Sequence, residues 1–124
     1  MREFHEAFDL ERPNRPTPPT SELAEIRQRI LDEEVREVAE AQQDGRIAEI
    51  AHELADVVYA AYGTAISYGI DLDAVLREIH QANMTKLGSD GRPVLRNGKV
   101  QKGDRYQPPD VAGVLARQTI GPGA

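Results

Sequence analysis

The spacing of apolar residues predicts three long helices in the first two thirds of the chain. Apolar side chains recur every three or four positions over residues 21–43, 46–68 and 72–87, which is the period of an amphipathic helix. Gly45 lies between the first two helices, and glycine adopts the left-handed conformation that ends a helix at no steric cost. We therefore expect these two helices to form an antiparallel αα-hairpin.

Shorter elements are predicted on either side of these helices. Residues 1–11 are expected to form a short amphipathic helix with Phe4 and Phe8 on one face. We favour packing of this face onto the bundle over stacking on a flat base, because aromatic side chains mostly serve packing. Residues 12–20 hold four prolines, so this segment should run extended. Residues 93–102 read as a small β-hairpin on an Asn-Gly turn.

The predicted second helix is apolar almost all the way round, so most of its surface must be covered. Three long helices in one chain cannot supply that cover. We therefore predict an all-α helical bundle whose antiparallel αα-hairpin core is completed by dimerisation, as a homodimer or a dimer of dimers. The predicted single domain comprises an N-terminal arm over 1–20, a helical core over 21–87, and a basic β-hairpin with an irregular tail over 88–124.

Four acidic residues occupy matched positions about Gly45. Glu37 lies eight residues before this glycine and Glu53 lies eight after it. Glu34 lies eleven residues before it and Asp56 eleven after it. At about 1.5 Å of rise per residue, each pair is expected at the same height on facing helices. Within each helix the two acids are three residues apart, so they share a face.

The helix faces that carry these acids are otherwise apolar, with Ile26 and Ile30 on the first helix and Val57 and Ala60 on the second. Buried carboxylates repel one another and lose hydration, so they need a cation. With oxygen ligands alone a hard ion fits best, and we predict Mg²⁺, with Mn²⁺ as the alternative. Most helical glutamates are solvated; the matched spacing inside an apolar stripe is what favours a metal site here.

The composition limits the classes of function. A chain of 124 residues with 40% hydrophobic and 29% charged residues is typical of one globular domain. Cysteine is absent, which excludes disulfides and thiolate sites. The sequence contains no run of about 18 apolar residues, so no membrane span is predicted. The start has no apolar signal-peptide core, so a cytoplasmic location is expected. The net charge of −6 argues against binding to nucleic-acid polymers.

The charges divide along the chain. Residues 1–76 carry a net charge of −10, whereas residues 77–124 carry +4 and all three lysines. An acidic segment for a metal and a basic segment for an anion can thus come from different parts of the chain, although many basic tails only aid solubility. Lys86 can reach an anionic ligand or complement the dipole of the third helix, and its spacing does not decide between these roles.

Active sites for phosphoryl transfer commonly combine metal-binding carboxylates with basic side chains. Divalent ions bridge phosphate oxygens and lower the pKa of a bound water. Glu33, beside the metal set, can hold a further ion, orient the water or be solvated. The cations expected to neutralise phosphates are Lys86, Lys99, Lys102 and Arg105.

The order of these residues resembles a known family. Glu33-Glu34-x-x-Glu37 followed by Glu53-x-x-Asp56 resembles the EExxE…ExxD signature of the MazG-like all-α nucleoside triphosphate pyrophosphohydrolases. The segment Ala82-Asn83-Met84-Thr85-Lys86 and the glycine- and lysine-containing stretch 90–103 resemble the later part of bacterial and phage single-domain members. The likeness covers about residues 21–110.

This resemblance implies an activity and assigns residues to it. Members of the family hydrolyse a (deoxy)nucleoside triphosphate between the α and β phosphates, with Mg²⁺, and form dimers around a four-helix core. The base varies and includes dUTP and dCTP. The implied metal ligands are Glu34, Glu37, Glu53 and Asp56. The resemblance also places Asn83 and Lys86 at positions that meet the nucleotide. We predict Glu33, Glu34 and Glu37 as the catalytic residues. The predicted substrate-binding residues are Asn83, Lys86, Lys99, Lys102, Arg105 and Tyr106.

Three other functions are alternatives to nucleoside triphosphate hydrolysis. A non-catalytic helical dimer with a structural Mg²⁺ would bind a partner and release no pyrophosphate. A ferritin-like di-iron bundle needs two Glu-x-x-His elements, and the sequence supplies one, Glu49 to His52, so this reading is disfavoured. The third reading keeps the fold and changes the substrate to phosphoribosyl-ATP, as in related histidine-pathway hydrolases, which the Asn-Gly hairpin and long tail fit less well.

Overall fold

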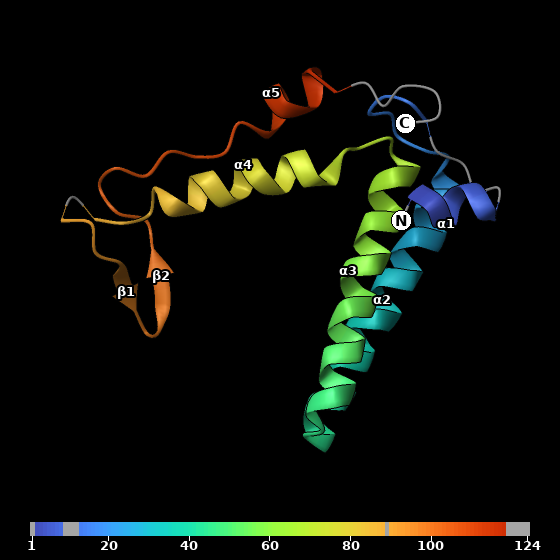
Figure 1. Cartoon of the computed structure of the whole chain (residues 1–124), viewed down its shortest axis with the longest axis horizontal. Helices are drawn as coiled ribbons and strands as arrows, with labels where there is room; N and C mark the ends of the chain where they lie inside the picture. The colour runs from blue at the N-terminus through green and yellow to red at the C-terminus, as the bar shows by residue number, and fades with distance from the viewer. Residues whose placement is uncertain (1, 9–12, 89, 119–124) are drawn as a thin grey trace. The chain divides into compact units, whose positions relative to one another are not determined.

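The computed structural model describes residues 2–8, 13–88 and 90–118, which are mostly helical (Figure 1). The predicted all-α class with a small C-terminal hairpin is confirmed. The elements in chain order are α1 (Arg2–Ala7), α2 (Ser21–Asp44), α3 (Ile47–Ser67), α4 (Leu72–Met84), β1 (Val94–Arg96), β2 (Lys99–Gln101) and α5 (Val111–Ala116). The chain divides after Ile70 into two compact units, the first with α1 to α3 and the second with the other elements.

The first unit is built on the predicted hairpin, in which α2 and α3 pack against each other over most of their length. The Thr20 hydroxyl begins α2 by accepting a hydrogen bond from the Leu23 N–H at 3.2 Å. Gly45 ends the helix with φ +71°, and its N–H donates to the Ala41 carbonyl at 3.0 Å. The left-handed glycine therefore reverses the chain where the sequence predicts the turn.

The N-terminal arm folds back onto this hairpin. Phe4 on α1 lies against Tyr59 on α3, with ring centroids 5.8 Å apart in an edge-to-face arrangement. The proline-rich segment crosses the end of α3, where the Thr17 N–H donates to the Tyr68 carbonyl at 2.8 Å. Gly69 follows with φ +70°, and a Cβ there would collide with the Arg15 carbonyl. Glycine at 69 thus ends α3 and makes room for the arm.

In the second unit, Asp71 begins α4 by accepting a hydrogen bond from the Ala74 N–H. The predicted end of this helix at residue 87 is wrong, since α4 ends at Met84. The Thr85 hydroxyl donates to the Ala82 carbonyl at 2.6 Å and also accepts from the Gln107 N–H at 2.8 Å. These bonds turn the chain out of the helix three residues early.

Beyond α4 the chain forms the predicted hairpin and then returns. Strands β1 and β2 are antiparallel, and Asn97 and Gly98 between them have φ +52° and +75°, as a two-residue primed turn requires. The returning segment runs beside α4, where the Asp110 N–H donates to Glu78 at 2.9 Å. At its end the Gln118 side chain bonds the backbone of Asp71 in both directions.

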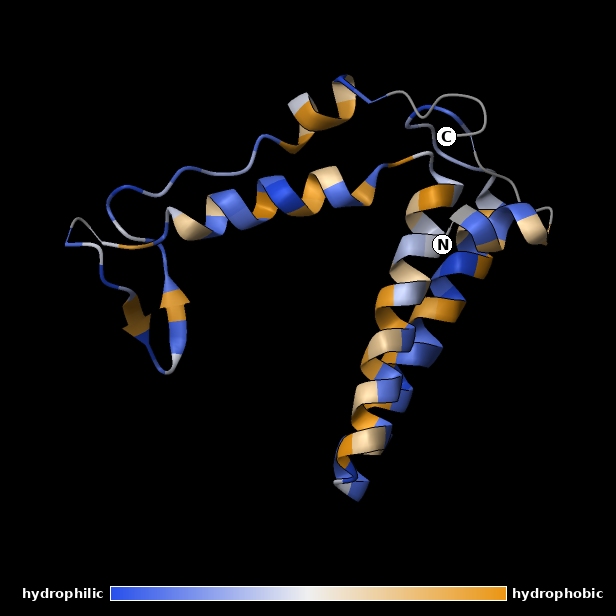
Figure 2. Cartoon of the chain, viewed as in Figure 1, coloured by the Kyte–Doolittle hydropathy of each residue, from blue (hydrophilic) through white to orange (hydrophobic). Residues whose placement is uncertain are grey.

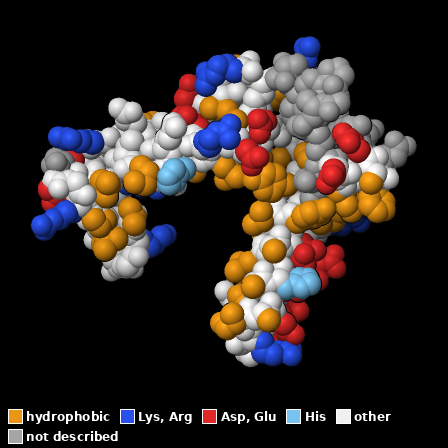
Figure 3. All heavy atoms as spheres, viewed as in Figure 1, with side chains coloured by type: hydrophobic (Ala, Val, Ile, Leu, Met, Phe, Trp, Pro, Cys, Tyr) orange, Lys and Arg blue, Asp and Glu red, His pale blue; other side chains and the backbone are white. Residues whose placement is uncertain are grey.

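Many large apolar side chains of the first unit remain exposed within the single chain. Apolar residues colour much of α3 in Figure 2, and hydrophobic side chains gather over this part of the surface in Figure 3. The exposed ones on α2 and α3 are Ile26, Val35, Ile47, Leu54, Val58 and Tyr59. The dimer expected to cover them stays a prediction. Among the described helices, none is long and apolar enough to cross a membrane.

Candidate metal centre and adjoining cavity

The four acids at matched distances from Gly45 meet between α2 and α3. One carboxylate oxygen from each lies within 4.8 Å of those of the other three, and all four side chains are half-buried. The hairpin produces this cluster because the acids lie at equal heights on facing helices and point to the shared seam. The acid cluster consists of Glu34, Glu37, Glu53 and Asp56.

Mutual repulsion and loss of hydration favour protonation within the acid cluster. Burial is the main cause of the raised pKa of Glu34. The charges of neighbouring carboxylates raise it further; these are Glu37, Asp56 and Glu33. A hydrogen bond with Glu37 is the main cause of the raised pKa of Glu53, followed by burial and the Glu37 charge. A cation placed here would oppose the increase in both pKa values, because its charge favours the ionised carboxylates.

The donor set fits a hard divalent ion. Glu34 Oε2 and Glu53 Oε2 are shielded from solvent, and neither has a hydrogen-bond partner among the residues that the structure describes. Shielded carboxylate oxygens without partners are costly. Coordination by Mg²⁺ or Mn²⁺ would satisfy them with the oxygen ligands that these ions prefer. The residues that would hold the ion are the four members of the acid cluster.

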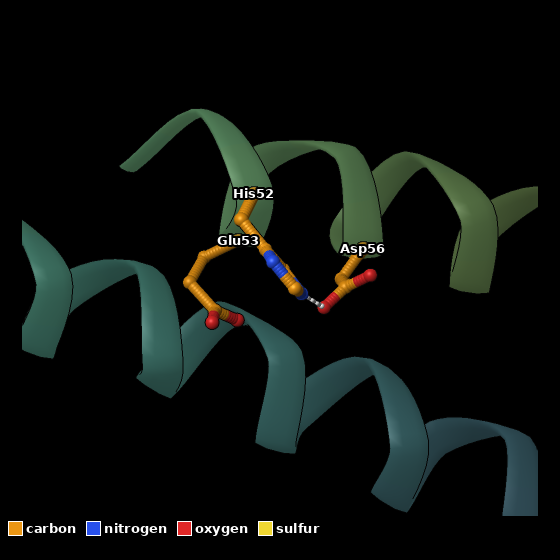
Figure 4. Close-up of side chains that lie close together, drawn as sticks. All are labelled: His52, Glu53 and Asp56. Atoms are coloured by element: carbon orange, nitrogen blue, oxygen red, sulfur yellow. Dashed lines mark ion pairs between the residues drawn. The ribbon is translucent and has the colours of Figure 1, made fainter. Parts of the chain in front are cut away.

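His52 adds a contact that the sequence analysis did not assign to the site. Its Nε2 lies 3.1 Å from Asp56 Oδ2, one helical turn away on α3. Figure 4 shows these two side chains meeting while Glu53 extends toward α2. A histidine bonded to one carboxylate oxygen can fix the orientation of the other toward an ion. The four-residue spacing of His52 and Asp56 was the available signal.

Two other predicted acids have different surroundings. Glu33 is exposed on α2 and lies outside the acid cluster, beside an open patch that includes Arg29 and Arg36. Glu49 of the Glu-x-x-His element pairs with Arg46 at 2.7 Å near the hairpin turn. Glu49 is therefore engaged away from the cluster, which further weakens the di-iron reading.

A cavity of about 210 Å³ adjoins the acid cluster inside the first unit. Its lining comes from α1, α2 and α3 and includes two members of the acid cluster. The lining residues are Phe4, His5, Arg27, Ile30, Glu34, Asp56, Tyr59, Ala60 and Gly63. The acid cluster thus adjoins a mostly apolar, partly open space that is lined by helices of the same unit.

Arg27 is fixed at the wall of this cavity by two buried groups. Its Nε–H donates to the Ser67 hydroxyl at 2.8 Å, and one terminal nitrogen lies 3.1 Å from His5 Nε2. His5 and Ser67 are each only 1% exposed. Burial lowers the pKa of Arg27, although an arginine stays charged at neutral pH. The sequence analysis missed this residue, but Arg27 lies seven positions before Glu34 and so shares its face of α2.

The residues assigned to the substrate belong to the second unit, and the acid cluster belongs to the first. Asn83 is exposed near the end of α4, and Lys86 is half-buried just beyond it. Lys99 lies on β2, exposed to solvent. The Lys102 ammonium lies 4.9 Å from the centre of the Tyr106 ring, a cation–π contact. Arg105, between these last two, is also exposed. Their roles toward a nucleotide stay predictions.

Comparison with known proteins identifies a family for the helical part of the chain. A family model described as phosphoribosyl-ATP pyrophosphohydrolase matches residues 1–83, which include the arm, both helices of the hairpin and all four acids. No curated protein matches the chain.

Proposed function

The chain belongs to the phosphoribosyl-ATP pyrophosphohydrolase family, and from this we propose that it hydrolyses a nucleoside triphosphate to the monophosphate and pyrophosphate with Mg²⁺. This family lies in the same all-α superfamily as the MazG-like enzymes, so the activity class is hydrolysis of a phosphoric anhydride in a nucleotide. The observation that carries the proposal is the meeting of four carboxylates within 4.8 Å on facing helices.

In the proposed reaction the acid cluster holds the metal and the protein positions the water. A bound divalent ion supplies charge for the phosphate oxygens and lowers the pKa of a water. Water adds at phosphorus, the bond between the α and β phosphates breaks, and pyrophosphate leaves with the bond electrons. Glu33, exposed beside Glu34, is suited to accept the proton because its carboxylate lies outside the metal set. His52 orients Asp56 through their contact at 3.1 Å.

A second candidate substrate is favoured by the family match itself. Phosphoribosyl-ATP carries the same triphosphate group, so the acid cluster would serve either substrate. The match ends at residue 83 and leaves out the β-hairpin and its cations. That part of the chain resembles the later part of the MazG-like members, and it supports a nucleoside triphosphate as the first candidate.

One panel of substrates tests the proposal. The purified full-length protein is incubated with Mg²⁺ and canonical or modified nucleoside triphosphates, and in parallel with phosphoribosyl-ATP, while pyrophosphate release is measured. We expect release from at least one triphosphate. Glu37→Gln should lower kcat at least about a hundredfold, because a metal ligand is lost while the helical core stays intact.

Glu40→Gln is the matched control, because Glu40 is exposed on the same helix and outside the acid cluster. It should retain wild-type turnover. No release from any substrate would overturn the enzymatic proposal in favour of a non-catalytic dimer. Release from phosphoribosyl-ATP alone would select the second candidate.

A further inference from the structure

The cavity beside the acid cluster has the position expected of a nucleoside site. Glu34 and Asp56 contribute to both the cavity and the cluster, so a molecule in the cavity would reach the proposed metal site directly. Arg27 and Glu34 are two helical turns apart, which places Arg27 about 10 Å along the helix from the acids. This span suits a nucleotide whose phosphates lie at the metal site and whose base lies deeper in the cavity.

The walls of the cavity suit a flat ring. Phe4 is 39% exposed and Tyr59 is 49% exposed, and both line the space together with Ile30. Pockets for whole drug-sized ligands have volumes of about 300 to 1,000 Å³. A cavity of about 210 Å³ is smaller and fits one ring system. Aromatic side chains stack on any base, because every base has a π face.

Gly63 is a second feature of the cavity wall, on the α3 side. A glycine inside a helix destabilises it by comparison with alanine. Gly63 lies within α3, is buried, and lines the cavity. The wall of the cavity is therefore formed by backbone alone at this position.

Arg27 supplies hydrogen-bond donors to a ligand in the cavity. Within the described residues no acid forms an ion pair with it, and two of its five N–H groups are used by Ser67 and His5. Arginine has no acceptor, so in this contact the guanidinium is the donor and His5 Nε2 the acceptor. The remaining N–H groups are donors, and arginine has no acceptor. A ligand group that meets them must be an acceptor.

We propose that this cavity binds the base of the nucleotide substrate and that Arg27 selects bases with a keto oxygen at C4 of a pyrimidine or C6 of a purine, namely uracil, thymine or guanine. The proposal rests on the proposed function. A phosphate fits the cavity less well, because Phe4 and Ile30 offer no donors and two acids, Glu34 and Asp56, line the same space. An amino group at the same position of cytosine or adenine would face the donors of Arg27 and leave them unpaired. The keto preference also favours a nucleoside triphosphate over phosphoribosyl-ATP, whose base derives from adenine.

The test compares base selectivity in wild type and in Arg27→Gln. We expect wild type to have a kcat/KM for dUTP at least about tenfold above that for dCTP, the effect of one hydrogen bond to a charged group. In Arg27→Gln the ratio should fall toward one, because an amide both donates and accepts. Calorimetric binding of UMP and CMP without metal should follow the same preference, independently of turnover. Arg29→Gln, two residues away and outside the cavity, should keep the wild-type ratio.

Gly63→Ala tests the site without removing a buried hydrogen bond. Alanine favours the helix, so this variant should fold, while its added methyl group narrows the cavity and raises KM about tenfold for every base. An unchanged dUTP-to-dCTP ratio in a folded Arg27→Gln, an equal loss for all bases, or an unchanged KM in Gly63→Ala would overturn the cavity assignment. Absence of hydrolysis of every nucleotide by wild type would instead overturn the proposed function.

Discussion

At the scale of single residues, the acid cluster makes folding sensitive to protons and to cations. Glu34 and Glu53 both have pKa values raised above the ordinary value of 4.5, through burial and through the hydrogen bond with Glu37 respectively. Each group is therefore more easily ionised in the unfolded chain than in the folded one. This difference links the stability of the protein to pH and to metal.

The first prediction at this scale concerns metal-free protein. Between the unfolded pKa of about 4.5 and the higher folded pKa, the folded state binds more protons than the unfolded state, so the free energy of unfolding falls as pH rises. Glu34→Gln should flatten this fall, because the amide does not titrate. Urea unfolding at pH values from 4.5 to 7.5 measures the slope.

Added Mg²⁺ should raise the free energy of unfolding of wild type more at pH 7 than near pH 5, where protons compete with the ion for the carboxylates. Glu34→Gln should lose most of this gain, whereas Glu40→Gln should keep it. A wild-type slope retained in Glu34→Gln would contradict the assignment of the titration to the acid cluster.

At this scale, the sequence predicts the positions of side chains correctly where these positions depend on spacing along a helix. The four acids were predictable because equal counts from Gly45 place them opposite one another. The grouping of His5, Arg27 and Ser67 was not, since these residues come from three helices and His5 joins the other two only through the docking of α1. Periodicity shows which residues share a face, but not which distant segment covers that face.

At the scale of elements, the helix starts and turns follow from local chemistry. Thr20 and Asp71 each begin a helix by accepting a backbone hydrogen bond, as their residue types predict. The end of α4 was missed because it depends on the bond between Gln107 and Thr85, which are 22 residues apart. A helix end that is fixed by a distant segment leaves no signal in the local pattern.

Two glycines with the same backbone conformation give a prediction at this scale. Gly69→Ala should lower the free energy of unfolding by about 3 kcal/mol or more, since a left-handed alanine costs about 1–2 kcal/mol and its Cβ also collides with the Arg15 carbonyl. Gly45→Ala should lower it by only about 1–2 kcal/mol, because no atom lies near its Cβ. Chemical unfolding of both variants gives the comparison, and equal losses would show that the arm adapts at no cost.

At the scale of the whole molecule, the exposed apolar face of the hairpin supports assembly. Leu54 is 50% exposed and Val58 is 54% exposed on α3, and such a face on a single chain usually marks an interface. We predict a homodimer, or a dimer of dimers, by size-exclusion chromatography with light scattering. Leu54→Glu should shift the mass toward the monomer, because it introduces a charge into the apolar contact. Gln42→Glu, an added charge at an exposed polar position, should leave the mass unchanged.

The single-domain organisation also stays a prediction. The family match covers the whole described part of the first unit and ends within α4. The sequence predicts the secondary structure of the basic segment well, including the turn at Asn97 and Gly98. It cannot predict how that segment meets a nucleotide, because amphipathic spacing encodes helix faces and not the docking of a hairpin.

The equal spacing of the acids on either side of Gly45 limits where the chain can gain or lose residues. Glu37 and Glu53 are separated by 16 positions, and one extra residue between them would rotate every following α3 side chain by about 100°. The acids of α3 would then leave the seam, and no substitution nearby could return them. Insertions and deletions should therefore be excluded from this stretch unless they come in compensating pairs.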